Sequence, residues 1–188
     1  MTTTDKRTDV LKASLKLFVS QGVHTVTMAQ IGKEANVGIG TIYKHFKDKE
    51  EIMQQIWIEQ KKWESKFVFE NFKNVGSVEE RFRKLWKKVI RYFIENPLEF
   101  QFSYYFAASP ILTDEIHNIA MKDFLTFDKI FQEGLDQGLF KPLLAHHLRL
   151  YTFSTINGWI LWAMDEKIDF NDKKIDLFLD MAWDSVKK

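Results

Sequence analysis

The chain has 188 residues, 45% of them hydrophobic, which is enough for one large or two small packed domains. It contains no Cys, and this excludes disulfides, a thiolate nucleophile and a Cys-ligated metal site. The formal net charge is only +1, but residues 1–50 carry a balance of +3 and the remainder −2, a gradient that agrees with a nucleic-acid face near the amino terminus without identifying one.

The first residues lack the apolar core of a signal peptide, and no apolar run approaches the ~18 residues that span a bilayer. We therefore expect a soluble, cytoplasmic protein that does not associate with a membrane. Three prolines and eight glycines leave few places to turn, and most gaps between them carry a helical apolar period. The sequence predicts an all-α fold of nine helices with no strands.

The first helix is expected over residues 4–21, with Gly22 ending it. Thr27-Met28-Ala29-Gln30 has the hydroxyl-x-x-Gln form of a capping box, which predicts a second helix from Met28 to Ala35. Asn36 tolerates a positive φ, so residues 35–38 are expected to form a tight turn before a third helix that runs to Phe46.

In the third helix Ile42 and Phe46 stand four residues apart and are expected to face inward. The remaining surface then presents Thr41, Tyr43, Lys44 and His45. Two short helices joined by such a turn form a helix-turn-helix, whose second helix normally enters the major groove of DNA. The competing interpretation is a coincidental pair of packed helices, with Tyr43 partly in the core and His45 a plain surface residue.

Six further helices are predicted from caps and apolar periodicity. They are expected over residues 48–72, 77–96, 98–108, 113–137 and 145–165, and from residue 171 to the end.

Residues 5–52 resemble the amino-terminal domain of the tetracycline-repressor (TetR) family of bacterial regulators. The pattern comprises Thr27 opening the second helix, Ile31 in its core, Val37 at the turn, Gly40-Thr41-x-Tyr43-x-His45-Phe46 in the third helix and Lys49 opening the fourth. Gly32 departs from the family's usual Ala, and Gly38 stands where a Ser often caps. Gly38 is compatible with the resemblance because Gly also serves as an N-cap. Gly32 is compatible with it if the helix packs closely at that point.

The resemblance implies two domains, a helix-turn-helix DNA-binding domain over residues 1–50 and a helical ligand-binding and dimerisation domain over residues 51–188. It also implies a homodimer formed through the eighth and ninth helices. The expected dimerisation surface on the eighth helix comprises Leu148, Thr152, Thr155, Ile156, Trp159 and Ala163, with Gly158 allowing close backbone approach. At the DNA, we expect Thr27, Thr41, Tyr43, His45 and Lys49 to position phosphates, and Ile39, Gly40 and Lys44 to approach base edges.

Aromatic residues are concentrated outside the helix-turn-helix, since only three of the 28 lie within residues 1–50. By resemblance, a small lipophilic or aromatic effector would bind in the helical domain. The candidate contacts are Phe102, Tyr105, Phe106, Met121, Phe124, Trp159 and Trp162. For each of them, plain core packing is the competing interpretation.

The resulting hypothesis is a ligand-responsive transcriptional regulator, a repressor that binds a palindromic operator in double-stranded DNA as a dimer and leaves it when a small molecule binds. An enzyme is the first rival, but no spaced nucleophile, acid/base pair or metal-ligand motif supplies a catalytic site. His146 and His147 are adjacent and point about 100° apart on a helix, so we expect no metal and no cofactor. The second rival is an architectural or protein-binding helical module.

Overall fold

The structure is a computed structural model that describes residues 5–188. All regular elements in this range are helical, and the described chain contains no β-strand beyond one isolated bridge between Phe140 and Lys187. The all-α prediction is confirmed. The chain packs as two compact units, one comprising residues up to Lys62 together with Pro97–Ala120, the other Trp63–Asn96 and Met121–Lys188.

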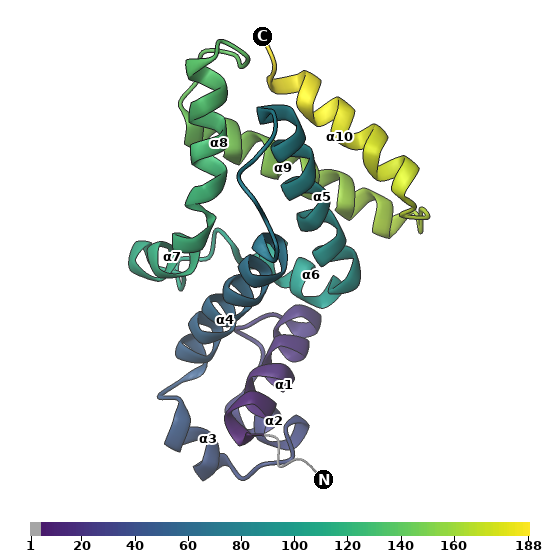
Figure 1. The fold of residues 1–188 in the computed structure, drawn as a ribbon. Coiled ribbons are helices and arrows are strands. Elements are labelled where there is room, and N and C mark those ends of the chain that lie inside the picture. Colours follow the sequence, from purple (N-terminus) through teal and green to yellow (C-terminus); the bar gives the residue numbers. More distant parts are fainter. Residues whose placement is uncertain (1–4) are drawn as a thin grey trace. The chain divides into compact units, whose positions relative to one another are not determined.

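The first unit holds the helix-turn-helix and the helices that support it (Figure 1). Its elements are α1 (Lys6–Gln21), α2 (Met28–Glu34), α3 (Ile39–His45), the first part of α4 (Lys49–Phe69), α6 (Pro97–Phe106) and most of α7 (Asp114–Met121). Val10 and Phe18 of α1, Ile31 of α2 and Ile42 of α3 have no exposed surface. They belong to one apolar core, which also includes Phe102 of α6.

The second unit is an aromatic-rich bundle. It contains the end of α4, α5 (Val78–Glu95), the 3₁₀ helix η1 (Lys122–Phe124), α8 (Leu125–Asp136), α9 (Ala145–Asp165) and α10 (Asp172–Val186). Phe82 and Trp86 of α5 are buried, and their rings lie 5.2 Å from Trp183 of α10 and 4.7 Å from Phe127 of α8 respectively. Burial of a large aromatic side chain removes ~150–250 Å² from water, so these contacts account for much of the unit's cohesion.

The expected helix over residues 113–137 is wrong as one continuous element. It is divided at η1 into α7 and α8, which follow one another without a loop. The tighter 3₁₀ geometry coincides with the passage of the chain from the first unit to the second. Phe124 of η1 is buried there and its ring lies 5.9 Å from that of Phe69.

The remaining boundaries follow the prediction closely, except that α4 ends at Phe69 rather than near Phe72. The expected start of the first helix at Thr4 lies outside the described residues, and α1 begins at Lys6. The boundary between the two compact units does not coincide with the functional boundary expected at residue 50. The reason is that α6 and most of α7 pack in the amino-terminal unit. The functional division of the chain stays a prediction.

Candidate nucleic-acid interface

The entrance to α2 is fixed by the capping box that the sequence predicts. The Gln30 backbone N–H donates to the Thr27 hydroxyl at 3.2 Å, and the Thr27 backbone N–H donates to Gln30 Oε1 at 2.7 Å. The Thr27 hydroxyl also lies 2.9 Å from Gln30 Oε1. Thr27 is exposed but already occupied in holding the first turn of the helix.

The turn between α2 and α3 is tight and contains a left-handed residue. Asn36 has φ = 54°, and the Val37 amide donates to the Gly32 carbonyl at 2.9 Å. A Cβ at Gly32 would lie 3.0 Å from the Val37 carbonyl oxygen and 3.4 Å from Ile42 Cδ1. Close packing between the two helices therefore explains a glycine that would otherwise cost α2 about 1 kcal/mol relative to Ala.

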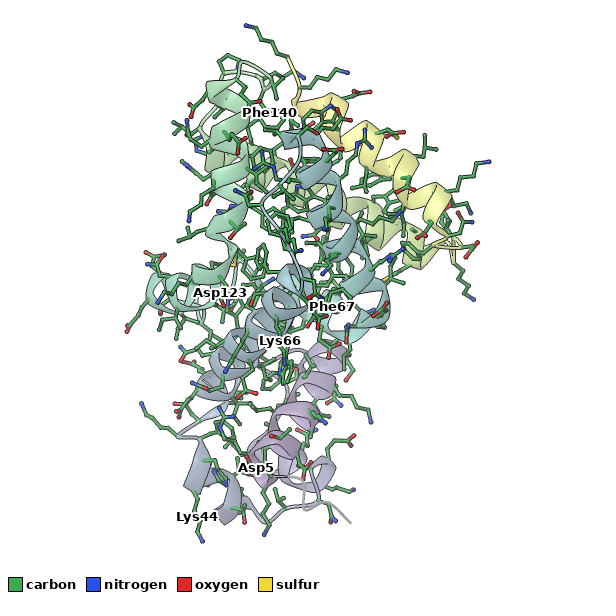
Figure 2. All side chains as sticks on the ribbon, viewed as in Figure 1. Asp5, Lys44, Lys66, Phe67, Asp123 and Phe140 are labelled. Carbon is green, nitrogen blue, oxygen red and sulfur yellow. The ribbon has the colours of Figure 1, made fainter. Side chains whose placement is uncertain are left out.

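The two faces of α3 differ sharply in exposure. Ile42 and Phe46, the residue that ends the helix, are buried in the core of the first unit. Ile39 and Tyr43 expose 49% and 55% of their surface. Gly40, Lys44 and His45 are also exposed and Thr41 is half-buried. In Figure 2, Lys44 projects away from α3.

Gly40 is a glycine that the fold does not require. A Cβ built there would meet no atom within 4 Å. Its backbone is helical, so the position needs no positive φ. The missing side chain leaves the outward surface of α3 free for close approach by another molecule.

Lys49 is the expected site residue whose surroundings differ most from the expectation. Its ammonium donates to the His24 and Val26 carbonyl oxygens, both at 2.9 Å. These carbonyls lie in the segment between α1 and α2. Local pattern could not reveal this contact, because the partners are 25 and 23 residues away in the sequence.

Arg7 is a further residue that sequence reasoning missed. Its guanidinium donates to Gln55 Oε1 at 2.9 Å, pairs with Glu59, and lies 5.5 Å from the centre of the Phe46 ring. The side chain thus ties α1 to α4 beside the residue that ends α3. No local signal predicts it, since Gln55 and Glu59 lie 48 and 52 residues further along.

The candidate effector contacts fall in both compact units. In the first, Phe102 is buried with its ring 6.5 Å from Trp57, Phe106 is half-buried and Tyr105 is exposed. In the second, Phe124 is buried, Met121 is half-buried, Trp159 stacks on Phe178 with centroids 4.3 Å apart, and the exposed Trp162 donates from Nε1 to Glu166 at 2.7 Å. Phe102 and Phe124 have core contacts, so their role at an effector stays a prediction.

The expected dimerisation surface of α9 is mostly covered within the chain, since only Thr155 and Trp159 of its six residues are half-buried rather than buried. Leu148, Thr152, Ile156 and Ala163 are buried within the second unit. A different face is exposed, with Tyr151, Gly158 and Trp162 along it. On α10, Leu177 and Met181 expose 61% and 62% of their surface one turn apart.

A Cβ at Gly158 would also meet no atom within 4 Å. Packing inside the chain does not explain this glycine in the middle of α9. In the part of the chain that the structure describes, no three His, Asp or Glu side chains gather in a way that would hold a metal ion. Nor is any helix between residues 5 and 188 long and apolar enough to cross a membrane.

Comparison with known families identifies both halves of the chain. The family of bacterial regulatory proteins called tetR matches residues 10–56. The family described as tetracyclin repressor-like, C-terminal domain, matches residues 77–187, more than half of the chain. The two matches are separated only by the end of α4 and the loop that follows it.

Several individual relatives are similar to this chain over nearly its whole length and theirs. An uncharacterised HTH-type transcriptional regulator of Haemophilus influenzae is 26% identical over 98% of this chain and 97% of its own. A TetR-family transcription regulator from Shewanella sp. PV-4 superposes with a TM-score of 0.89 at 20% identity, over 98% of this chain and 100% of its own. The regulator FadR of Bacillus subtilis, solved in complex with stearoyl-CoA, gives a TM-score of 0.76 at 21% identity, over 93% of this chain and 96% of its own.

The structural likenesses show the fold, while the family matches assign both the helix-turn-helix and the helical domain that follows it. The chain therefore belongs to the TetR family: it is a transcriptional regulator with a DNA-binding helix-turn-helix, and not an enzyme.

Proposed function

We propose that this regulator is a homodimeric repressor that binds a palindromic operator in double-stranded DNA and is released by a small lipophilic or aromatic effector. The observation that carries the proposal is the division of α3 into a buried face and an outward face. Ile42 and Phe46 pack one side into the core, whereas Ile39 and Tyr43 on the opposite side expose about half of their surface. A surface that combines a phenol, a cation, an imidazole and a bare glycine suits the major groove.

Contacts to DNA divide by chemistry. Thr27, Thr41, Tyr43, His45 and Lys49 are the proposed phosphate-positioning residues, and Ile39, Gly40 and Lys44 the proposed base-edge residues. The exposed Ile39 offers an apolar contact to a thymine methyl group, and the exposed Lys44 an ammonium to the acceptors of guanine. Gly40 supports close approach, because nothing in the protein fills the space beside it.

Dimerisation is proposed through α9 and α10. Exposed apolar side chains on both helices support this, because an apolar patch on one molecule is stabilised when a second copy covers it. Gly158 supports it independently, since its missing side chain leaves room for a helix of the partner. A twofold dimer would present two α3 helices to half-sites about one helical turn apart, which is why a palindrome is expected.

The effector proposal rests on composition and on analogy. Aromatic rings are dense outside the helix-turn-helix, and a protein of similar fold was solved with stearoyl-CoA. Effector binding would favour one of two pre-existing conformations and change the separation of the paired α3 helices. Because half-sites have fixed spacing, such a change would break simultaneous contact.

The DNA-binding proposal is tested by footprinting the intergenic DNA beside the protein's own gene. We expect protection of a short inverted repeat, with affinity that falls steeply as salt rises. Binding without salt dependence, or no protection of that DNA, would contradict the proposal.

The effector proposal needs a separate test. Purified protein would be screened by thermal shift with lipophilic cations, flavonoids, fatty acids and acyl-thioesters, including stearoyl-CoA. A tight binder raises the melting temperature by mass action and should then weaken the footprint. A binder that raises the melting temperature and leaves the footprint unchanged would contradict release by effector.

A further inference from the structure

Arg7 joins three helices of the first unit through one side chain. It is the second residue of α1, and its guanidinium donates to Gln55 Oε1 at 2.9 Å and pairs with Glu59. Gln55 and Glu59 stand four residues apart on α4, so they lie on the same face of that helix. Two bonds from one planar guanidinium to one helix face fix direction as well as distance.

The same guanidinium lies beside the end of α3. Its central carbon is 5.5 Å from the centre of the Phe46 ring, within the range of a cation–π contact. Phe46 is 2% exposed, and its backbone N–H donates to the Ile42 carbonyl at 2.9 Å, which closes the last turn of α3. Arg7 therefore contacts α4 and the residue that ends α3 at the same time.

The three helices of the amino-terminal region pack less closely on α4 than on one another. Along their backbones, α1, α2 and α3 approach each other closely, whereas their approach to α4 is sparser. Ile52 and Ile56 of α4 do share the apolar core of the first unit. Burial of apolar surface is non-directional, so it stabilises this arrangement without fixing the angle between the helices. The bonds of Arg7 add a directional restraint beyond the first turn of α4.

We propose that Arg7 is a positioning residue for operator recognition, which sets the orientation of α3 by holding α4 and Phe46 against the beginning of α1. The proposal deepens the operator binding proposed above and rests on it. Without the guanidinium the apolar core remains, but α3 has a wider range of orientations. Reading of base edges requires one orientation, whereas non-specific binding depends mainly on charge near the phosphates. Loss of Arg7 should therefore reduce the preference for the operator.

Two other roles of Arg7 give different results. If its guanidinium neutralises a DNA phosphate, its loss weakens binding to every duplex alike and reduces the slope of log affinity against log salt by about 0.9. If it only stabilises the fold, its loss lowers the melting temperature and leaves the ratio of operator to non-specific affinity of the folded protein unchanged. A positioning residue is distinguished by a fall in that ratio.

The test uses three variants of the full-length protein. Arg7→Met keeps an apolar stem and removes the guanidinium, and Arg7→Lys keeps the charge and loses the planar fork. Lys12→Met, at an exposed position on the same helix, is the matched control because it removes the same charge. Affinities for the operator located by footprinting and for an unrelated duplex would be measured between roughly 50 and 200 mM salt. Melting curves select a temperature at which the variants are folded, and amide hydrogen exchange of residues 42–46 is measured without DNA.

We expect Arg7→Met to lower the ratio of operator to non-specific affinity on the order of tenfold, since hydrogen bonds to charged groups are among the stronger ones in proteins. Exchange at residues 42–46 should become faster, because the end of α3 loses a restraint. Arg7→Lys should show a smaller loss of the same kind, because an ammonium cannot hold Gln55 and Glu59 in a planar fork. Lys12→Met should leave both the ratio and the exchange unchanged.

Several results would overturn the proposal. An equal loss on both duplexes with a reduced salt slope would show a phosphate ligand, and a lower melting temperature with an unchanged ratio would show a purely structural contact. Unchanged exchange at residues 42–46 would show that Arg7 does not act through α3. If Arg7→Met does not fold, Arg7→Lys decides, and wild-type behaviour of that variant would assign the effect to charge alone. A wild type without preference for the operator contradicts the proposed function itself, which distinguishes that failure from a failure of Arg7.

Discussion

Adjacent residues of α3 serve opposite purposes. Ile42 has no exposed surface and belongs to the apolar core of the first unit, whereas its neighbour Tyr43 has more than half of its surface in solvent. Substitution on the inner side should therefore affect folding, and substitution on the outer side should affect only the interaction with DNA. The following two predictions use this separation.

Tyr43→Ala should lower operator affinity and leave folding nearly unchanged. An exposed substitution away from caps and packing contacts usually alters stability by no more than ~0.5 kcal/mol. Ile42→Ala, by contrast, should lower the free energy of unfolding by about 2–5 kcal/mol, because it leaves a cavity in the core. Urea denaturation beside an operator titration separates the two effects. A Tyr43→Ala protein that binds the operator like the wild type would contradict the role given to the outer face.

Gly40→Ala should shift stability and affinity in opposite directions. The added methyl group meets no atom of the protein, and Ala is favoured over Gly in a helix by up to about 1 kcal/mol. The variant should therefore melt at a higher temperature than the wild type. It should also bind the operator more weakly, because the methyl group stands between α3 and the base edges. Equal or tighter operator binding would show that DNA does not approach Gly40 closely.

At the scale of elements, a row of ion pairs in the second unit, called the ladder below, fixes how α10 is aligned along α5. Arg83 pairs with Asp180, Lys87 with Asp176 at 2.6 Å, and Arg91 with Asp172 at 2.7 Å. The basic residues on α5 and the acidic residues on α10 each recur every four residues, about one turn of helix. The first basic residue pairs with the last acidic one, so the two helices run antiparallel. Beside the ladder, Phe82 and Trp183 supply the apolar contact between these helices.

Reversing one charge of the ladder should reveal its contribution. Lys87→Glu sets a carboxylate beside Asp172 and Asp176, and the free energy of unfolding should fall. Adding Asp176→Lys should restore most of it, with a coupling of ~0.2–1 kcal/mol that shrinks as salt rises, because both groups are partly exposed. A double-mutant cycle at low and high salt measures this coupling. No recovery in the double variant would mean that the pair contributes nothing to the register.

The contact between α5 and α8 should make stability depend on pH. Hydrogen bonds from the buried Arg81 guanidinium hold the pKa of the Glu133 carboxyl below its ordinary value of 4.5. A depressed pKa stabilises the folded state above the pKa of the unfolded chain, and that contribution disappears as the pH falls through the folded-state pKa.

Glu133→Gln should accordingly be less stable than the wild type at neutral pH. The difference should shrink as the pH falls below the ordinary carboxyl value of 4.5, where the wild type also loses its charge. Urea unfolding over a pH series provides the measurement. A difference that stays constant over this range would show that titration of Glu133 is not the cause.

At the scale of the whole molecule, the sequence predicted those structural features that depend on residues close together in the chain. The capping boxes at Thr27 and Ser77, the left-handed Asn36 and the ends of α9 were all predictable, because each depends on residues within one turn. Contacts between distant segments were not. The bonds of Lys49 to the α1–α2 segment and the buried side of α9 depend on tertiary packing, which no local pattern encodes.

The break at η1 was missed for a related reason. Its residues carry no Gly or Pro and continue the helical period, so nothing in residues 113–137 predicts an interruption. Which aromatic residues line an effector site was equally beyond local reasoning. Phe102 and Phe124 turned out to have extensive core contacts, while Tyr105 and Trp162 are exposed.

Assembly of two chains should depend on Gly158. Gly158→Leu should improve the helix propensity of α9, and its Cβ meets no atom of the chain within 4 Å at this exposed position. It should weaken the dimer by blocking approach of the partner's helix. Sedimentation equilibrium of the wild type and the variant tests this. A variant dimer as stable as the wild type would place the interface on another surface.

The most direct test of the central claim compares an inverted repeat with an isolated half-site. Binding of the wild type to both would be measured across a salt series, once footprinting has located the operator. If two α3 helices enter successive major grooves of one duplex, the repeat should bind one dimer far more tightly than the half-site, with a steep loss of affinity as salt rises. Equal affinity for the half-site and the full repeat would contradict the account.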